Sequence, residues 1–111
     1  MAISNDCAAV QANTSGTQAI SGPAAGTDWI ITSASISHTG DTPTVPTITV
    51  LRNGTDSIVY TSDELQPGET VQFPELSGVV LKGDNTDSLE VAIDANQTGT
   101  VNFDFSFVAK S

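Results

Sequence analysis

The chain has 111 residues, a formal net charge of −10 at pH 7 and 38% hydrophobic residues, which fits one folded domain with one core. The negative charge argues against nucleic acid as a partner, because phosphate binding depends on Lys and Arg, and it opposes attachment to anionic membranes. No apolar run approaches the roughly 18 residues that a membrane span needs.

Hydroxyl side chains replace much of the missing charge. The chain contains fifteen Thr and twelve Ser, while only 14% of its residues are charged. Thr is β-branched and suits a half-wet pleated surface, whereas the charged residues that favour helices are scarce. The composition therefore favours β-structure.

The first 27 residues are rich in Ala, Ser, Thr, Gly and Gln and contain few large apolar side chains. We expect residues 1–27 to form an arm and residues 28–111 to form the folded domain. Residues 8–11 suggest a short strand or a helical turn, and residues 18–21 suggest a second short strand before Gly22 and Pro23. The segment lacks the pattern of a secretory signal, which predicts folding in a cytoplasm, and we interpret Cys7 as an unreactive thiol.

A strand pattern begins at Trp29. Alternation over residues 29–38 predicts one buried face, made of Ile30, Thr32, Ala34, Ile36 and His38. A break at residues 39–43 follows, and Pro46 precedes the next expected strand, residues 47–51.

Two turn signals follow. Asn53 and Gly54 lie between apolar runs, which predicts that residues 47–51 pair with residues 58–60 in a hairpin. Residues 66–69, Gln-Pro-Gly-Glu, predict a type II turn that leads into a strand at residues 70–73.

Further strands are expected at residues 79–81, 88–93 and 101–107. The last alternates clearly, with Val101, Phe103, Phe105 and Phe107 on one face. About seven short strands separated by turns predict an all-β, antiparallel β-sandwich of jelly-roll-like form. The expected core contains Ile30, Ile36, Ile48 or Leu51, Val71, Phe73, Leu89, Val91, Phe103 and Phe105.

No catalytic constellation is evident, so we expect no enzyme, no catalytic residue and no cofactor. His38 is the only histidine, and no Gly-x-Ser-x-Gly elbow occurs. We interpret His38 as a hydrogen-bonded histidine at a strand end, with a pH-sensitive contact or a metal ligand as alternatives.

Acidic turns raise the question of a metal. Asp84, Asn85 and Asp87 fall in one tight turn, and Asp94 or Asp104 could add an oxygen ligand for Ca²⁺. The spacing does not match a calcium-binding loop, and Asp and Asn suit turns for conformational reasons alone. We therefore interpret these residues as a solvated turn and expect no metal site.

From Trp29 onward the chain resembles the small β-sandwich virion proteins of tailed bacteriophages, which include capsid decoration (cement) proteins and some tail or appendage proteins. The residues that carry this resemblance are Asp28 to Ser33 leading to His38-Thr39-Gly40, Leu65 to Thr70, Leu81 to Asp84, and Ser88 to Val91. The similarity covers about three-quarters of the chain, and the residues that carry it are turn and strand signatures rather than chemical motifs.

The resemblance implies a non-enzymatic structural protein of a virion, made in the host cytoplasm. It implies a homotrimeric capsid decoration protein that binds the major capsid protein or another virion protein. A carbohydrate- or receptor-binding module of a tail or appendage is the alternative. From their apolar character in the arm and at the first strand, we expect the partner-binding residues to be Ala8, Ala9, Val10, Ile20 and Trp29.

Overall fold

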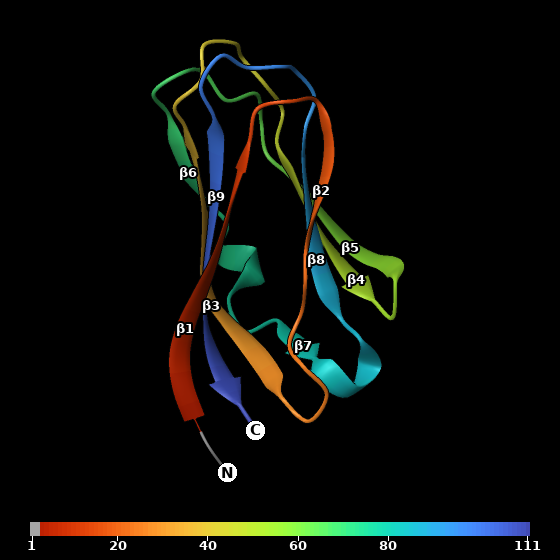
Figure 1. Cartoon of the computed structure of the whole chain (residues 1–111). Helices are drawn as coiled ribbons and strands as arrows, with labels where there is room; N and C mark the ends of the chain where they lie inside the picture. The colour runs from red at the N-terminus through yellow and green to blue at the C-terminus, as the bar shows by residue number, and fades with distance from the viewer. Residues whose placement is uncertain (1–2) are drawn as a thin grey trace.

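A computed structural model gives the structure of the chain and describes residues 3–111, apart from the side chains of residues 56 and 57. Within these residues, nine strands form two sheets that face each other (Figure 1). Sheet A contains β1 (Ile3–Ala12), β9 (Val101–Lys110), β3 (Asp28–His38), β6 (Thr70–Gln72) and β7 (Val80–Lys82). Sheet B contains β2 (Gly16–Ile20), β8 (Ser88–Ile93), β4 (Thr47–Arg52) and β5 (Thr55–Thr61).

The strand order is that of a jelly roll. Sheet A runs β1-β9-β3-β6, with β7 beside another part of β3, and sheet B runs β2-β8-β4-β5. Every paired strand is antiparallel, and successive strands repeatedly cross from one sheet to the other. The predicted all-β sandwich of jelly-roll-like form is confirmed.

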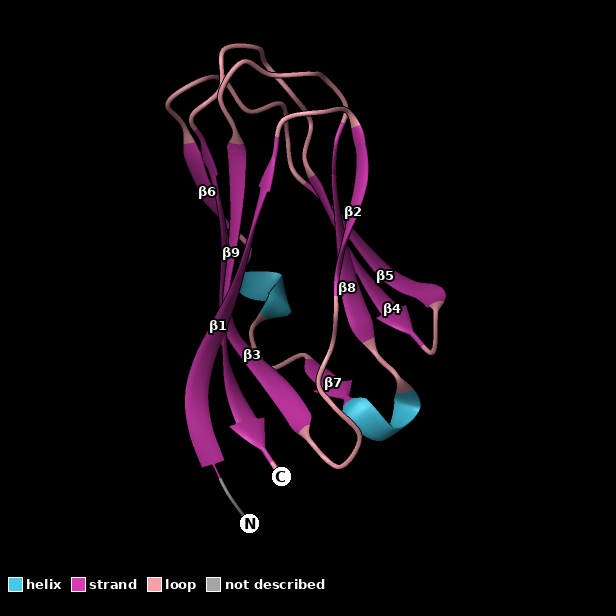
Figure 2. Cartoon of the chain, viewed as in Figure 1, coloured by secondary structure: helices cyan, strands magenta, loops and turns pink. Residues whose placement is uncertain are grey.

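Among residues 3–111, helical structure is confined to two short 3-10 turns, Pro74–Leu76 and Gly83–Asn85 (Figure 2). Within residues 3–111 no helix has the length and apolar character needed to cross a membrane.

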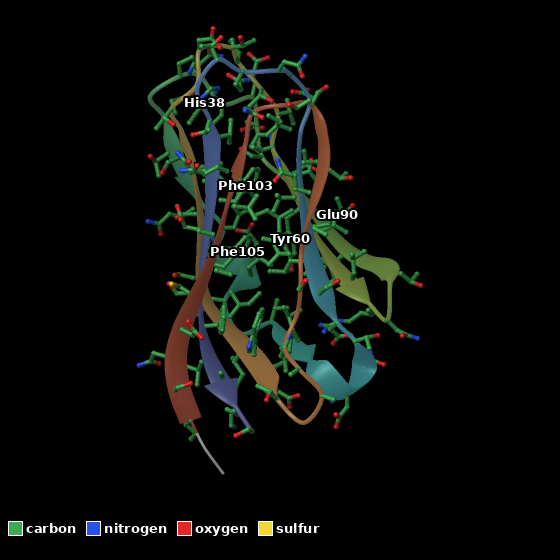
Figure 3. All side chains as sticks on the ribbon, in the orientation of Figure 1. His38, Tyr60, Glu90, Phe103 and Phe105 are labelled. Atoms are coloured by element: carbon green, nitrogen blue, oxygen red, sulfur yellow. The ribbon has the colours of Figure 1, made fainter. Side chains whose placement is uncertain are left out.

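The core lies between the sheets and is built from alternate residues of each strand. Phe103 and Phe105 project from β9 into this space and are at most 1% exposed (Figure 3). The expected core residues Ile36, Ile48, Phe73, Leu89 and Val91 are buried with them, and Val71 is half-buried against the same cluster. Leu51, offered as an alternative to Ile48, is only half-buried because alternation along β4 puts it on the opposite face from the buried Ile48 and Val50.

The expected inward position of Ile30 is wrong. A β-bulge between Ile31 and Ser33 adds one residue to β3 relative to β9. Because side chains alternate across a strand, this extra residue puts Ile31 inside, at 1% exposure, and turns Ile30 outward. Thr32 is exposed at the bulge, while Ala34, Ile36 and His38 keep the expected inward face.

The first 27 residues differ from the expectation of a separate arm. β1 pairs with β9 over its whole length, and β2 pairs with β8. Ala12 and Ile20 are buried in the core, at 1% and 7% exposure. The small side chains of this segment suit edge strands, where one face rests on the core and backbone pairing supplies much of the contact.

Both predicted turns have the expected backbone. Asn53 and Gly54 have φ of 53° and 79°, as the turn of the hairpin between β4 and β5 requires. Gly68 has φ of 90° in the turn that leads into β6.

Candidate interaction surfaces

The two N-terminal strands form one flank of the sandwich. β1 ends the order of sheet A and β2 ends the order of sheet B, so each pairs with a neighbour on one side only. The strands lie on the same side of the molecule (Figure 1), and Nε2 of Gln18 donates to the carbonyl of Gln11 at 3.4 Å. We call residues 3–20 the N-terminal flank.

The flank is nearly free of charge. Asp6 is its single charged residue, although the protein carries a formal charge of −10. Proteins usually protect exposed edge strands with Lys, Pro or bulges. β1 has ten residues with neither Lys nor Pro, and it pairs with β9 in unbroken register. Its free edge is therefore suited to contact with another protein.

The five expected partner-binding residues occupy different environments. Ala8 and Val10 are half-buried against the core, and Ile20 is buried within it. Trp29 is half-buried and stacks on Phe107, with ring centroids 4.1 Å apart. Ala9 is exposed, so among the five it presents the most accessible side chain.

The turn that was weighed as a calcium site is held by protein donors. Nη1 of Arg52 donates to Oδ2 of Asp87 at 2.7 Å, and the backbone N–H of Lys82 donates to the same oxygen at 2.9 Å. Nδ2 of Asn85 donates to Oδ1 of Asp87 at 2.7 Å. The Asp87 side chain is 1% exposed, so this residue is a buried structural carboxylate and not a solvated one.

Two effects oppose each other at Asp87. Burial by itself raises the pKa of the carboxyl, but the Lys82 N–H, the Arg52 guanidinium and the Asn85 amide outweigh it and hold the pKa below its usual range. Arg52 also contacts the carbonyl of Val80. The carboxylate thus joins the end of β4 to β7.

The other acidic residues that were considered as calcium ligands do not lie around a common point. Oδ1 of Asp84 accepts the N–H of Gly26 at 2.7 Å, and Oδ1 of Asp94 accepts the N–H of Val45 at 2.7 Å. Asp104 is exposed on β9. Among the described side chains, those of residues 3–55 and 58–111, no group of three His, Cys, Asp or Glu is placed to hold a metal ion.

Acidic side chains also hold the loops at the other end of the sandwich. The N–H of Val45 and the hydroxyl of Thr44 lower the pKa of Asp94. The N–H of Thr98 lowers the pKa of Asp41 in the same way. These carboxylates accept hydrogen bonds across loops that are far apart in the sequence.

His38 is buried at the end of β3, at 1% exposure. Its Nδ1 accepts the N–H of Gly40 at 3.0 Å, which leaves Nε2 as the donor to the carbonyl of Thr42 at 2.7 Å. Both ring nitrogens are therefore used to shape the following loop. The expectation of a hydrogen-bonded histidine at a strand end is confirmed.

An acidic groove lies at the other flank, between the end of β5, the following loop and β6. Its volume is about 360 Å³, and its acidic lining residues are Asp63, Glu64, Glu69 and Glu75. Sequence analysis missed this groove. The concentration of four of the thirteen acidic residues between positions 63 and 75 was the available signal.

Comparison with models of known protein families and with curated protein sequences finds no match. Among solved structures, a protein of Bacillus endospore appendages, described as a novel family of disulfide-linked pili, has a TM-score of 0.55 at 14% identity. The match covers 98% of this chain and 88% of that chain, and it supports the fold. A chain of the T13 particle of the virus IBDV has a TM-score of 0.40 at 14% identity, over 95% of this chain and 35% of that chain.

Proposed function

We propose that this chain is a non-enzymatic structural subunit that docks on a neighbouring protein through its N-terminal flank. The observation that carries the proposal is the exposed, regular edge of β1 on a flank with a single charge, in a protein of charge −10. An extended edge strand gains affinity from backbone hydrogen bonds to a partner strand. A flank with a single charge also limits the repulsion that the rest of the protein would impose on an acidic partner.

The assembly that best suits this subunit is a bacteriophage virion, with the chain as a capsid decoration protein bound to the major capsid protein. The sequence resemblance from Trp29 onward and the jelly-roll fold support this assignment. A homotrimer made in the host cytoplasm is the form that the resemblance implies.

A filamentous appendage is a second candidate, because the fold match to the endospore appendage protein covers 98% of this chain. That protein is described as forming disulfide-linked pili. Here Cys7, exposed on β1, is the single cysteine of the sequence. One thiol per chain joins at most two copies, so a filament of this protein would depend on noncovalent contacts.

A carbohydrate-binding module is less well supported. Stacking on a sugar needs an open aromatic face. One face of Trp29 is covered by Phe107, and Tyr60 is half-buried against the core.

The test compares two lysine substitutions on sheet A. Ala9→Lys places a charge on the edge strand β1, whereas Ser106→Lys places the same charge at an exposed position of the central strand β9. We expect Ala9→Lys to weaken binding to purified particles at least tenfold while Ser106→Lys binds like the original chain. Equal binding by both variants would contradict docking through the flank.

Electron microscopy of the same samples separates the two assemblies. Binding at capsid lattice points supports a decoration protein, and loss of the protein should then reduce the resistance of particles to heat. Filaments formed by the purified chain alone support the appendage, and attachment confined to tails supports the receptor-binding module.

A further inference from the structure

The outer face of sheet A changes character along its length. Toward the loop end that contains His38, paired residues on this face are polar, as in the row Gln11, Asn102 and Ser37. The next rows contain Ala9, Asp104 and Ser35, then Cys7, Ser106 and Ser33. This composition is expected of a sheet face exposed to water.

Beyond the β-bulge, the same face becomes apolar. Val108 of β9 pairs with Ile30 of β3, and Ile30 pairs with Val80 of β7. The three aliphatic side chains form one cross-strand row, in which neighbouring side chains are close enough to touch. All three are half-buried at the surface and none belongs to the core cluster. Ile3, at 64% exposure, lies one row further along β1.

Most of the positive charge of the protein lies beside this row. Lys110 and Lys82 flank Asp28 in the adjacent row of the same face. The third cation of the sequence, Arg52, is paired with Asp87. The row of Lys110, Asp28 and Lys82 has a net charge of +1, so the rest of the chain carries −11, because −10 minus +1 is −11. We call Ile30, Val80, Val108, Lys82 and Lys110 the basic apolar patch.

An aliphatic row bordered by lysines fits an acidic partner with some apolar surface. The acidic groove on another copy of this chain has that chemistry, because the half-buried Val71 and the largely buried Leu65 and Phe73 line it together with its four carboxylates. Patch and groove occupy different parts of the molecule, on the outer face of sheet A and at the β5–β6 flank. Two copies can therefore join through unlike surfaces.

We propose that the basic apolar patch of one copy binds the acidic groove of the next. This contact goes beyond the proposed function, because it joins copies of the chain and does not use the free edge of β1. A contact between unlike surfaces forms a closed ring if the rotation between copies closes, and a filament if it does not. One interface thus suits either a ring-shaped trimer or a fibre.

The experiment measures self-association by sedimentation equilibrium. The patch variant Lys82→Ser/Lys110→Ser removes two cations, and the groove variant Asp63→Asn/Glu75→Gln removes two anions without touching a side-chain hydrogen bond of the described structure. The control Thr17→Glu/Ser106→Glu changes exposed residues outside both surfaces and lowers the net charge by two, as the patch variant does. A second patch variant, Ile30→Thr/Val108→Thr, keeps both lysines.

We expect the original chain and the control to associate, and the patch and groove variants each to weaken association at least tenfold. An equimolar mixture of patch and groove variants should form dimers and nothing larger, because one intact patch meets one intact groove. A monomeric original chain would overturn the proposal. Equal losses in the patch variant and the control, or a mixture that forms no dimer, would overturn it too.

Discussion

Asp87 shows how a single carboxylate fixes the end of the sandwich. Three donors, from β4, β7 and the turn that follows β7, surround it, and its side chain is 1% exposed. Among the described residues, no buried side-chain nitrogen or oxygen lacks a hydrogen-bond partner. A buried charge that is fully hydrogen-bonded stabilises the fold, whereas removal of its charge leaves donors without an acceptor.

The low pKa of Asp87 makes this contribution depend on pH. A carboxyl whose pKa is lower in the folded than in the unfolded state stabilises the fold above the unfolded pKa, and the effect is lost as pH falls through the folded pKa. We expect Asp87→Asn to cost about 1.5 to 3 kcal/mol at pH 7. The difference from the original chain should begin to shrink as pH falls below the unfolded pKa of about 3.9, and it should be lost as pH falls through the lower folded pKa, where the folded carboxyl takes up a proton.

Urea unfolding at several pH values between 7 and 3 measures this difference. A free-energy gap between the two proteins that stays constant over the whole range would show that Asp87 acts through its shape and not through its charge.

Phe105 tests the position of the last strand in the core. It is 1% exposed on β9, between Ala8 on β1 and Ala34 on β3 in the register of sheet A. Phe105→Ala should lower the free energy of unfolding by about 3 to 5 kcal/mol through lost burial and a cavity. Phe105→Leu, which keeps most of the volume, should cost less. A loss below about 1 kcal/mol for Phe105→Ala would contradict this position.

The hydrogen-bond partners of individual polar residues could not be predicted from the sequence. His38 was correctly interpreted as hydrogen-bonded at a strand end, because both the strand and its end follow from local patterns. Asp87 was interpreted as solvated, since its donor Arg52 lies 35 positions away and only the fold brings the end of β4 near the turn after β7. Contacts of this kind depend on topology, which local alternation does not specify.

At the scale of a strand, the bulge in β3 decides which surface the protein exposes. One extra residue between Ile31 and Ser33 reverses the faces of the segment before it. Period-two alternation assumes regular pairing, and both Ile30 and Ile31 are good strand residues. The sequence pattern therefore predicted the strand but not the reversal that creates the basic apolar patch.

Two alanine substitutions test the bulge. Ile31→Ala should cost about 2 to 5 kcal/mol because Ile31 is 1% exposed within the core. Ile30→Ala should cost less than about 1.5 kcal/mol, because Ile30 is half-buried on the outer face. Chemical denaturation of the two variants measures both values. A larger loss for Ile30→Ala than for Ile31→Ala would contradict the bulge and support the regular strand that alternation predicts.

The seven strands from residue 28 onward were predictable because large apolar residues alternate with polar ones between clear turns. β1 and β2 were recognised only as weak possibilities. Their inward residues include Ala8 and Ala12, whose small side chains give little contrast between the two faces. Backbone pairing with β9 and β8 supplies the stabilisation of β1 and β2 that the burial of their small side chains alone does not.

For the whole molecule, the first and last strands lie side by side. Ile3 of β1 pairs with Lys110 of β9, so the two ends of the described chain meet at one end of sheet A (Figure 1). β1 thereby covers one edge of β9, whose other edge pairs with β3. Removal of the first strand would turn a central strand with four inward aromatic or aliphatic residues into an edge.

Deletion of residues 1–12 should therefore lower the free energy of unfolding by more than about 2 kcal/mol, well outside the range of surface substitutions. The shortened chain loses the whole β1–β9 ladder and the burial of Ala12. Thermal unfolding followed by circular dichroism measures the loss. A peptide of residues 3–12 added in trans should restore part of the stability by refilling the vacant edge, and a scrambled peptide should not. If the shortened chain is as stable as the full chain, residues 1–12 behave as a separable arm and β1 is not needed for the fold.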